Sequence, residues 1–440
     1  MRKSAIILVL LFAVISLCGE EPQERLFTLQ DSVKIALENN LDIKTSEQKI
    51  VQKKWEKEDS KTSFLPKIVG TFSWTHLDKV PSISVPGMPI KIEMSKNDIY
   101  NARVTLSQPI FTGGALSSQY EMKKQELDIA HGENRLTTQD VIFQVIQAYF
   151  SILKASNFHQ AATALVNQRQ AHLVNVKKLF DAGLATKADI LKTEVALADA
   201  RQKLVETENM INLAKENFKT ILNFPYSCEI NIEDTLTRVW EGKELEAWKQ
   251  IAIKNREEIK QIERSKTTLE LAKKIVKSGY YPNIAFVLSL QGEKGTSSGL
   301  NSWYQNISAL LTANFDIWNW QSTKKKINAL DSQILQIETQ KQKIINLINL
   351  EITSSYLNLI SAQEKIKVME KAVEDAQENV RINDLLRREG LATTTDVLDA
   401  QTYLFQTKAS YYQALYDYQI AHYQLIKASG QLIDEFLATK

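Results

Sequence analysis

The chain has little glycine, proline and cysteine for its length. Its 440 residues include 14 glycines, 8 prolines and 2 cysteines. Because glycine and proline mark turns and interrupt helices, their scarcity predicts long, uninterrupted helices with few loops. The cysteines are Cys18, at the end of an apolar N-terminal run, and Cys228. We therefore expect no intramolecular disulfide framework in the mature chain.

The chain also lacks an excess of charge of one sign and, beyond its N-terminus, any long apolar run. It carries 54 basic and 52 acidic residues, a formal net charge of +2. This balance gives no reason to expect a nucleic-acid partner, and we predict none. No later stretch approaches the roughly 20 apolar residues of a transmembrane helix, which excludes a helical membrane protein.

The residue clusters that carry catalysis are absent as well. The five histidines include no pair at metal-ligand spacing, and Cys228 has no neighbouring thiol. There is no glycine-rich phosphate loop, no nucleophile elbow and no convincing pair of catalytic carboxylates. We predict that the protein is not an enzyme and that it has no metal and no cofactor.

The N-terminus has the features of a secretory signal. Met1-Arg2-Lys3 is followed by an apolar run from Ala5 to Leu17, which is typical of a charged n-region and a short h-region. We predict a signal peptide at 1–18. Two readings remain for Cys18: ordinary cleavage just after it or after Gly19, or lipidation of Cys18, against which the preceding Leu17 argues.

The chain contains two copies of one unit. Residues 109–223 align with 316–430 at a constant shift of 207, and upstream the shift is 216, so the difference falls between 66 and 109. Such a repeat indicates one duplicated architecture rather than several unrelated domains. The predicted boundaries are 27–223 for the first repeat, 224–243 for a connecting segment, 244–430 for the second repeat and 431–440 for a tail.

Each repeat is predicted to end in a long helical hairpin. Residues 321–389 contain no proline or glycine and have isoleucine and leucine at three- and four-residue steps, which is typical of a coiled-coil seam. Glycine then precedes Leu-Ala-Thr in both repeats. The chain reverses there, in a first tip at 179–186 and a second tip at 386–393, and Thr186 with Asp189 and Thr393 with Asp396 resemble capping boxes.

Four segments between the helices have the two-residue period of strands, at about 64–76, 99–110, 281–291 and 303–317. Each is about as long as a tilted membrane-crossing strand. A small soluble sheet is the alternative for any single strand, but two isolated hairpins cannot close a barrel, so closure must come from other copies. The positions predicted to face lipid are Phe72, Trp74, Val104, Leu106, Phe286, Leu288, Ile307 and Leu311.

Three motifs carry a resemblance to a known family. They are the corner Gln108–Gly114, the Gly-Leu-Ala-Thr-x-x-Asp-x-Leu tips at 183–191 and 390–398, and the opening segment Leu29–Asn40. Together with the repeat and the strands, they resemble the outer membrane efflux protein family, the TolC-like channel-tunnels. The second corner departs from the pattern, since Asp316, Trp320 and Gln321 replace Pro109, Gly113 and Gly114, and its shape stays open.

The resemblance implies a mainly α fold with transmembrane β, in which long coiled-coil helices and β-hairpins form a duplicated unit. A homotrimer would form a twelve-stranded barrel in outer membrane lipid above an α-helical periplasmic barrel. The implied function is the outer membrane channel of a tripartite efflux or type I secretion system. Its implied partners are a periplasmic adaptor and an inner-membrane pump of the RND, ABC or MFS type. The alternative function is a periplasmic coiled-coil scaffold without a pore.

The resemblance also implies site residues at the tips. Asp396 and Asp399 would line the constricted entrance, although either could merely cap its helix, and Asp189 reads mainly as a cap. Ala392 stands where family members have a gate-locking arginine, and whether the nearby Arg387 and Arg388 replace it is open. The predicted adaptor-docking residues are Gly183, Leu184, Ala185, Gly390, Leu391 and Ala392.

Overall fold

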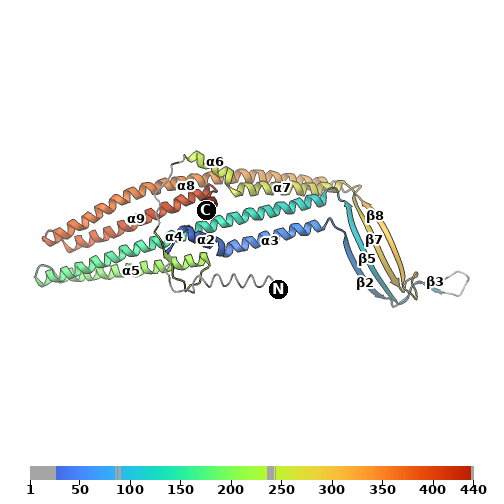
Figure 1. Ribbon diagram of the computed structural model, residues 1–440, viewed down its shortest axis with the longest axis horizontal. Coiled ribbons are helices and arrows are strands. Elements are labelled where there is room, and N and C mark those ends of the chain that lie inside the picture. The colour runs from blue at the N-terminus through green and yellow to red at the C-terminus, as the bar shows by residue number, and fades with distance from the viewer. Residues whose placement is uncertain (1–25, 85–86, 88–90, 235–241, 243, 438–440) are drawn as a thin grey trace. The chain divides into compact units, whose positions relative to one another are not determined.

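A computed structural model describes residues 26–84, 87, 91–234, 242 and 244–437 (Figure 1). The chain divides into two compact units. The hairpin unit consists of the described parts of 1–47, 133–259 and 343–440, and the sheet unit consists of those of 48–132 and 260–342. The predicted signal peptide and Cys18 lie outside the described residues.

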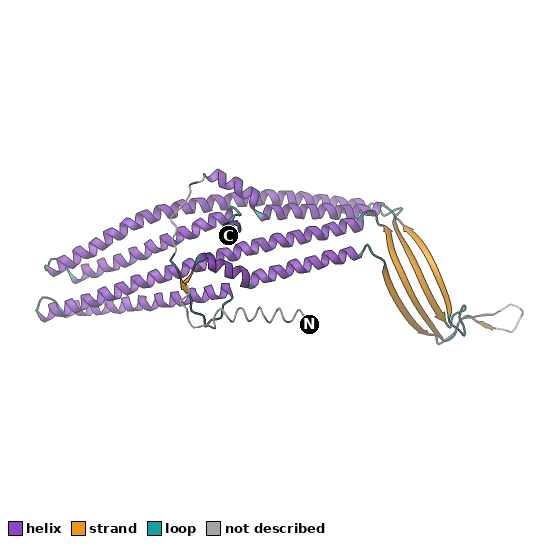
Figure 2. Cartoon of the chain, viewed as in Figure 1, coloured by secondary structure: helices purple, strands orange, loops and turns teal. Residues whose placement is uncertain are grey.

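Two helical hairpins dominate the hairpin unit, and the first part of the longer helix of each belongs to the sheet unit. The first is formed by α4 (Ala115–Asp181) and α5 (Lys187–Leu222), and the second by α8 (Ser322–Arg388) and α9 (Thr394–Ala428). Both α4 and α8 are 67 residues long, which corresponds to about 100 Å of helix. They are the longest of the helices coloured purple in Figure 2. Their length follows from the scarcity of residues that interrupt a helix.

Short elements surround the bases of the hairpins. They are α2 (Leu29–Asn39), α6 (Leu245–Asn255), α10 (Leu432–Leu437) and a parallel pair of β1 (Leu26–Phe27) and β6 (Asn231–Ile232). The hydroxyl of Thr28 accepts a hydrogen bond from the backbone N–H of Asp31 at 3.1 Å and so caps α2. The parallel pair is fixed to α4 because the Tyr149 hydroxyl donates to the carbonyl of Glu233 at 2.5 Å.

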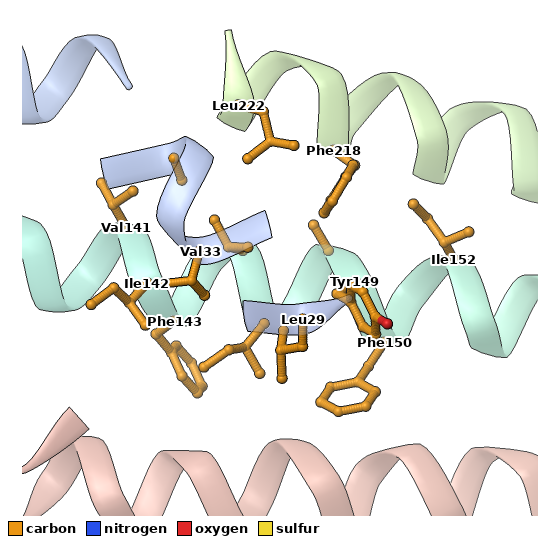
Figure 3. Close-up of a cluster of buried hydrophobic side chains, with 14 of the residues drawn as sticks. Leu29, Val33, Val141, Ile142, Phe143, Tyr149, Phe150, Ile152, Phe218 and Leu222 are labelled. Atoms are coloured by element: carbon orange, nitrogen blue, oxygen red, sulfur yellow. The ribbon is translucent and has the colours of Figure 1, made fainter. Parts of the chain in front are cut away.

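The largest buried cluster joins the N-terminal helix to the first hairpin. Tyr149 and Phe218 are 0% exposed, and Val33 of α2 is 1% exposed. Figure 3 shows these side chains converging from α2, α4 and α5. Full burial of a large apolar side chain is worth about 1.5–3 kcal/mol, so this cluster is a main source of stability for the unit.

The two repeats close their hairpins with equivalent contacts made by different residues. The side-chain amide of Asn40 donates to the carbonyl of Ile221 at 2.8 Å. Arg256, which aligns with Asn40 in the second repeat, donates to the carbonyl of Ala428, the counterpart of Ile221, at 3.2 Å. Each contact satisfies a carbonyl at the end of the returning helix, which would otherwise have no partner within its helix.

The sheet unit contains one four-stranded antiparallel sheet. Its order is β2 (Lys67–His76), β5 (Asp98–Phe111), β7 (Asn283–Lys294) and β8 (Tyr304–Asn314), as Figure 1 shows. The central pair, β5 and β7, joins the two repeats in a single sheet. A short ribbon of β3 (Ser82–Ser84) and β4 (Lys91–Glu93) lies between β2 and β5 in the sequence.

Ion pairs connect the helices of the sheet unit. α3 (Leu41–Thr62) contacts α4 through Lys53 and Glu126 at 3.2 Å, and α7 (Glu257–Lys277) contacts α8 through Lys266 and Glu338 at 2.7 Å. A one-turn 3-10 helix, Ser278–Tyr280, follows α7. Some of the nearly equal numbers of acidic and basic residues thus form ion pairs between neighbouring helices.

Both corners between strand and helix adopt the same unusual backbone. Gly113 and Gly114 have φ angles of 59° and 84°, and their counterparts Trp320 and Gln321 have 53° and 60°. A Cβ at Gly113 would lie 2.8 Å from the carbonyl oxygen of Ser278, so glycine is needed there for space as well as for conformation. The second corner keeps the left-handed shape without glycine, at a cost of roughly 1–2 kcal/mol for each residue.

Cys228 is 8% exposed. The expectation that the mature chain has no disulfide framework stays a prediction, because Cys18, the other cysteine of the sequence, lies outside the described residues. No helix in the described ranges combines the length and apolarity of a membrane span.

Candidate functional site

The strand pairing places the predicted lipid-facing residues on one face of the sheet. Residues directly opposite each other in neighbouring strands share a face, and Leu106 lies opposite Leu288 while Phe286 lies opposite Leu311. Phe72, Ile307 and Leu311 are 68%, 71% and 67% exposed. All eight predicted positions lie on this apolar face: Phe72, Trp74, Val104, Leu106, Phe286, Leu288, Ile307 and Leu311.

The opposite face of the sheet is more polar, although it also includes Val287 and Leu310. Arg103 and Gln291 are directly paired across β5 and β7, and the guanidinium of Arg103 donates to the side-chain oxygen of Gln291 at 2.7 Å. Thr105 and Ser289, two residues further along, share a hydrogen bond of 3.2 Å. The sheet therefore separates an apolar surface from a more polar one, which is the pattern of a strand wall between lipid and water.

The two outer strands leave the sheet open. β2 and β8 stand at its two ends, so one edge of each is without a partner strand in the described chain. An unpaired edge presents a row of backbone donors and acceptors that cannot remain unsatisfied in lipid.

The first tip has the geometry expected from its sequence. Gly183 has a φ angle of 77°, which allows the reversal, and the following Leu184 is 71% exposed. The Thr186 hydroxyl accepts from the backbone N–H of Asp189 at 3.2 Å, while the Asp189 carboxylate accepts from the backbone N–H of Thr186 at 2.9 Å. These reciprocal bonds form a capping box and start α5.

The second tip repeats this arrangement. Gly390 has a φ angle of 76° and Leu391 is 76% exposed. The Thr393 hydroxyl accepts from the backbone N–H of Asp396 at 3.2 Å, and the Asp396 carboxylate accepts from the backbone N–H of Thr393 at 2.7 Å. The cap function of Asp396 is therefore observed. Asp396 and Asp399 are both exposed, one turn apart in α9.

The capping contacts keep both tip carboxylates acidic. Hydrogen bonds from the hydroxyl and backbone of Thr186 hold the pKa of Asp189 below its usual value, with smaller contributions from Thr394 and from the charge of Arg387. Hydrogen bonds from Thr393 lower the pKa of Asp396 in the same way. Both carboxylates thus carry negative charge at neutral pH.

The two arginines near Ala392 differ in their surroundings. The guanidinium of Arg387 donates to the hydroxyl of Thr394 at 3.3 Å, which joins α8 to the start of α9. Its Nε atom is buried and has no hydrogen-bond partner among the described residues. Arg388 is exposed, and its charge acts on Asp384, whose pKa burial raises. Of the two arginines, Arg387 is therefore the one that forms a hydrogen bond between the helices of the second tip.

Sequence reasoning missed a pair of buried polar residues in α4. Arg169 and His172 are 4% and 6% exposed. They follow the buried Ala162 and Leu165 at the steps of a helical seam, and Val176 continues the series. Polar residues at seam positions were the available signal, but in a chain this rich in charge they resembled a solvated face.

The fold is that of an outer membrane channel-tunnel. The sequence profile described as "Outer membrane efflux protein" matches residues 33–223 and 248–431. The chain belongs to this family. The sequence-based function, the outer membrane channel of an efflux or type I secretion system with a large periplasmic part, is confirmed, and the scaffold without a pore is not favoured.

Individual relatives are distant. The chain is 23% identical to "Outer membrane protein TolC" of Vibrio cholerae over 359 residues, covering 77% of this chain and 78% of that protein. It is 19% identical to "Alkaline protease secretion protein AprF" of Pseudomonas aeruginosa over 345 residues, covering 76% and 70%. The CmeC outer membrane channel of Campylobacter jejuni has a similar fold, with a TM-score of 0.76, 16% identity and coverage of 92% and 86%.

Proposed function

We propose that three copies of the chain form one continuous duct through the outer membrane. The observation that carries this proposal is the four-stranded sheet with one apolar face and two open edges. β2 and β8 run in opposite directions, so β8 of one copy can pair with β2 of the next in the antiparallel manner of the rest of the sheet. Three copies supply twelve strands, which close a barrel and remove every edge.

The entrance of the duct is formed by the tips. Asp396 and Asp399 lie on one exposed side of α9, so three protomers would contribute a ring of six carboxylates. Such a ring favours cations and repels anions at a constriction. The proposed chemistry is therefore selective conduction and gating, without catalysis.

The proposed partners follow from the tips and from the relatives. Leu184 and Leu391 are exposed apolar residues at turns, suited to the hydrophobic groove contacts of a helical periplasmic adaptor. An inner-membrane pump of the RND, ABC or MFS type would supply the energy. The names of AprF and of "Proteases secretion protein PrtF" concern protease secretion, so polypeptides are a candidate cargo beside small molecules and metals.

The mature chain purified from outer membranes in detergent provides the test. We expect an oligomer with three times the mass of one chain, and ion conductance after its reconstitution in planar bilayers. A trimer that conducts would support the shared barrel. A soluble monomer or dimer without conductance would refute the duct and favour the scaffold.

A further inference from the structure

The first hairpin contacts the second through a buried cation. The guanidinium of Arg169 in α4 donates to the carbonyl of Leu398 at 2.8 Å and to the hydroxyl of Thr402 at 2.6 Å, both in α9. Its Nε atom is buried without a hydrogen-bond partner among the described residues. Both hydrogen-bond acceptors are neutral, so the packed state bears part of the free-energy cost of burying the charge of Arg169.

His172, one helical turn from Arg169, occupies the same buried seam. It is 6% exposed, and its Nε2 atom is buried without a hydrogen-bond partner among the described residues. Burial, and then the positive charges of Arg387 and Arg169, lower the pKa of His172 to about 4. The imidazole is therefore neutral while the hairpins are packed, because a third positive charge would be unfavourable there.

The carboxylates near Arg169 and His172 do not neutralise the positive charge of this buried site. Asp189 in α5 is engaged in its own capping box. Burial lowers the pKa of Arg169, while the charges of Asp199 in α5 and Asp399 in α9 raise it by less. Asp384, in α8, has a pKa raised by burial. A proton on His172 would consequently add a charge to a site where burial and two arginines already oppose it.

We propose that His172, buried between the hairpins beside Arg169 and Arg387, is an acid sensor that opens the tips of the channel. Protonation drives α4 away from α8 and α9, which returns the imidazole and both guanidinium groups to water. This inference deepens the proposed function and rests on it, since it assigns a regulator to the same entrance.

The direction of the effect follows from linkage. An imidazole in water has a pKa of 6.5, against about 4 in the packed hairpins. Above pH 6.5 the proton binds neither state, and as the pH falls from 6.5 towards 4 it binds only the separated state. The equilibrium should therefore shift towards separation by about tenfold per protomer at pH 5.5, and further at lower pH. The capping carboxylates Asp189 and Asp396 stay charged over this range because their pKa values are lowered.

Conductance as a function of pH tests the proposal. In planar bilayers, the open probability of the wild-type channel should rise at least tenfold between pH 7.5 and 5.5. His172→Gln should remove this rise, whereas His159→Gln, on the same helix, should retain it. Asp384→Asn serves as a second control, because its raised pKa makes it the competing titratable group. An unchanged acid response in His172→Gln would overturn the proposal.

A second measurement separates failure of the sensor from failure of the channel. The histidine imidazoles of the purified oligomer can be titrated by NMR in detergent, and the His172 signal assigned from its loss in His172→Gln. Titration well below pH 6 supports the sensor even if bilayer conductance fails, which would count against the proposed duct alone. Titration near pH 6.5 in the packed protein overturns the sensor whether or not the channel conducts.

Discussion

At the scale of single residues, β8 has two adjacent leucines whose side chains lie on opposite faces of the sheet. Leu311 lies opposite Phe286 on the apolar face, and its neighbour Leu310 lies opposite Val287 on the other face. They are 67% and 55% exposed in the single chain. The two leucines therefore differ mainly in whether the proposed barrel would turn them towards lipid or towards the lumen.

We predict that Leu311→Arg will impair assembly and Leu310→Arg will not. An arginine facing lipid near the midplane costs about 2–4 kcal/mol, while one facing a water-filled lumen is hydrated. The amount of trimer in outer membranes, and its resistance to urea, measure the difference. Equal effects of the two substitutions would contradict the assignment of the faces.

At the scale of elements, the start of α9 combines a structural role and a proposed functional one. Asp396 forms the capping box with Thr393, and loss of such a cap typically costs about 1 kcal/mol. Replacing Asp396 with alanine would therefore disturb the helix as well as the charge. Asparagine removes the charge and keeps an oxygen that can accept the capping bonds.

We predict that Asp396→Asn combined with Asp399→Asn will reduce the cation selectivity of the channel. The reversal potential in a salt gradient should move towards that of a non-selective pore, because six carboxylates would be lost from the entrance. Asp375→Asn with Glu378→Gln removes the same number of exposed charges from α8 and should leave the potential unchanged. If both double variants behave alike, the tips are not the selective constriction.

The elements show what the sequence can and cannot predict. The fold class was predicted correctly because α8 has no helix-breaking residue and because β2, β5, β7 and β8 alternate in polarity. The left-handed corner at Trp320 and Gln321 could not be predicted, since neither residue type favours that conformation. Arg169 and His172 were missed because only packing distinguishes a buried polar residue from a solvated one.

At the scale of the whole molecule, the tips are the proposed docking surface for a periplasmic adaptor. We predict that Leu184→Ser with Leu391→Ser will weaken binding of a purified periplasmic adaptor about tenfold or more. A tenfold loss corresponds to about 1.4 kcal/mol, which is less than the loss of one hot-spot side chain from an interface. Surface plasmon resonance measures the affinity. Leu213→Ser, at an exposed position of α5, is the control, and trimer mass and conductance should be unchanged. An unaltered affinity would exclude the tips as the docking site.

The buried arginine of α4 also has a consequence for symmetry. If the two repeats were identical, a trimer would have six equivalent hairpins, and every contact between neighbouring hairpins would be the same. Arg169 breaks this equivalence, because its counterpart in the second repeat is Ala376, which is 1% exposed. In the proposed trimer, the seams within a protomer would contain the charge and the seams between protomers would not. Contacts with and without a buried charge would then alternate around the ring of hairpins. The charged contacts within each protomer would be the defined positions at which neighbouring hairpins separate.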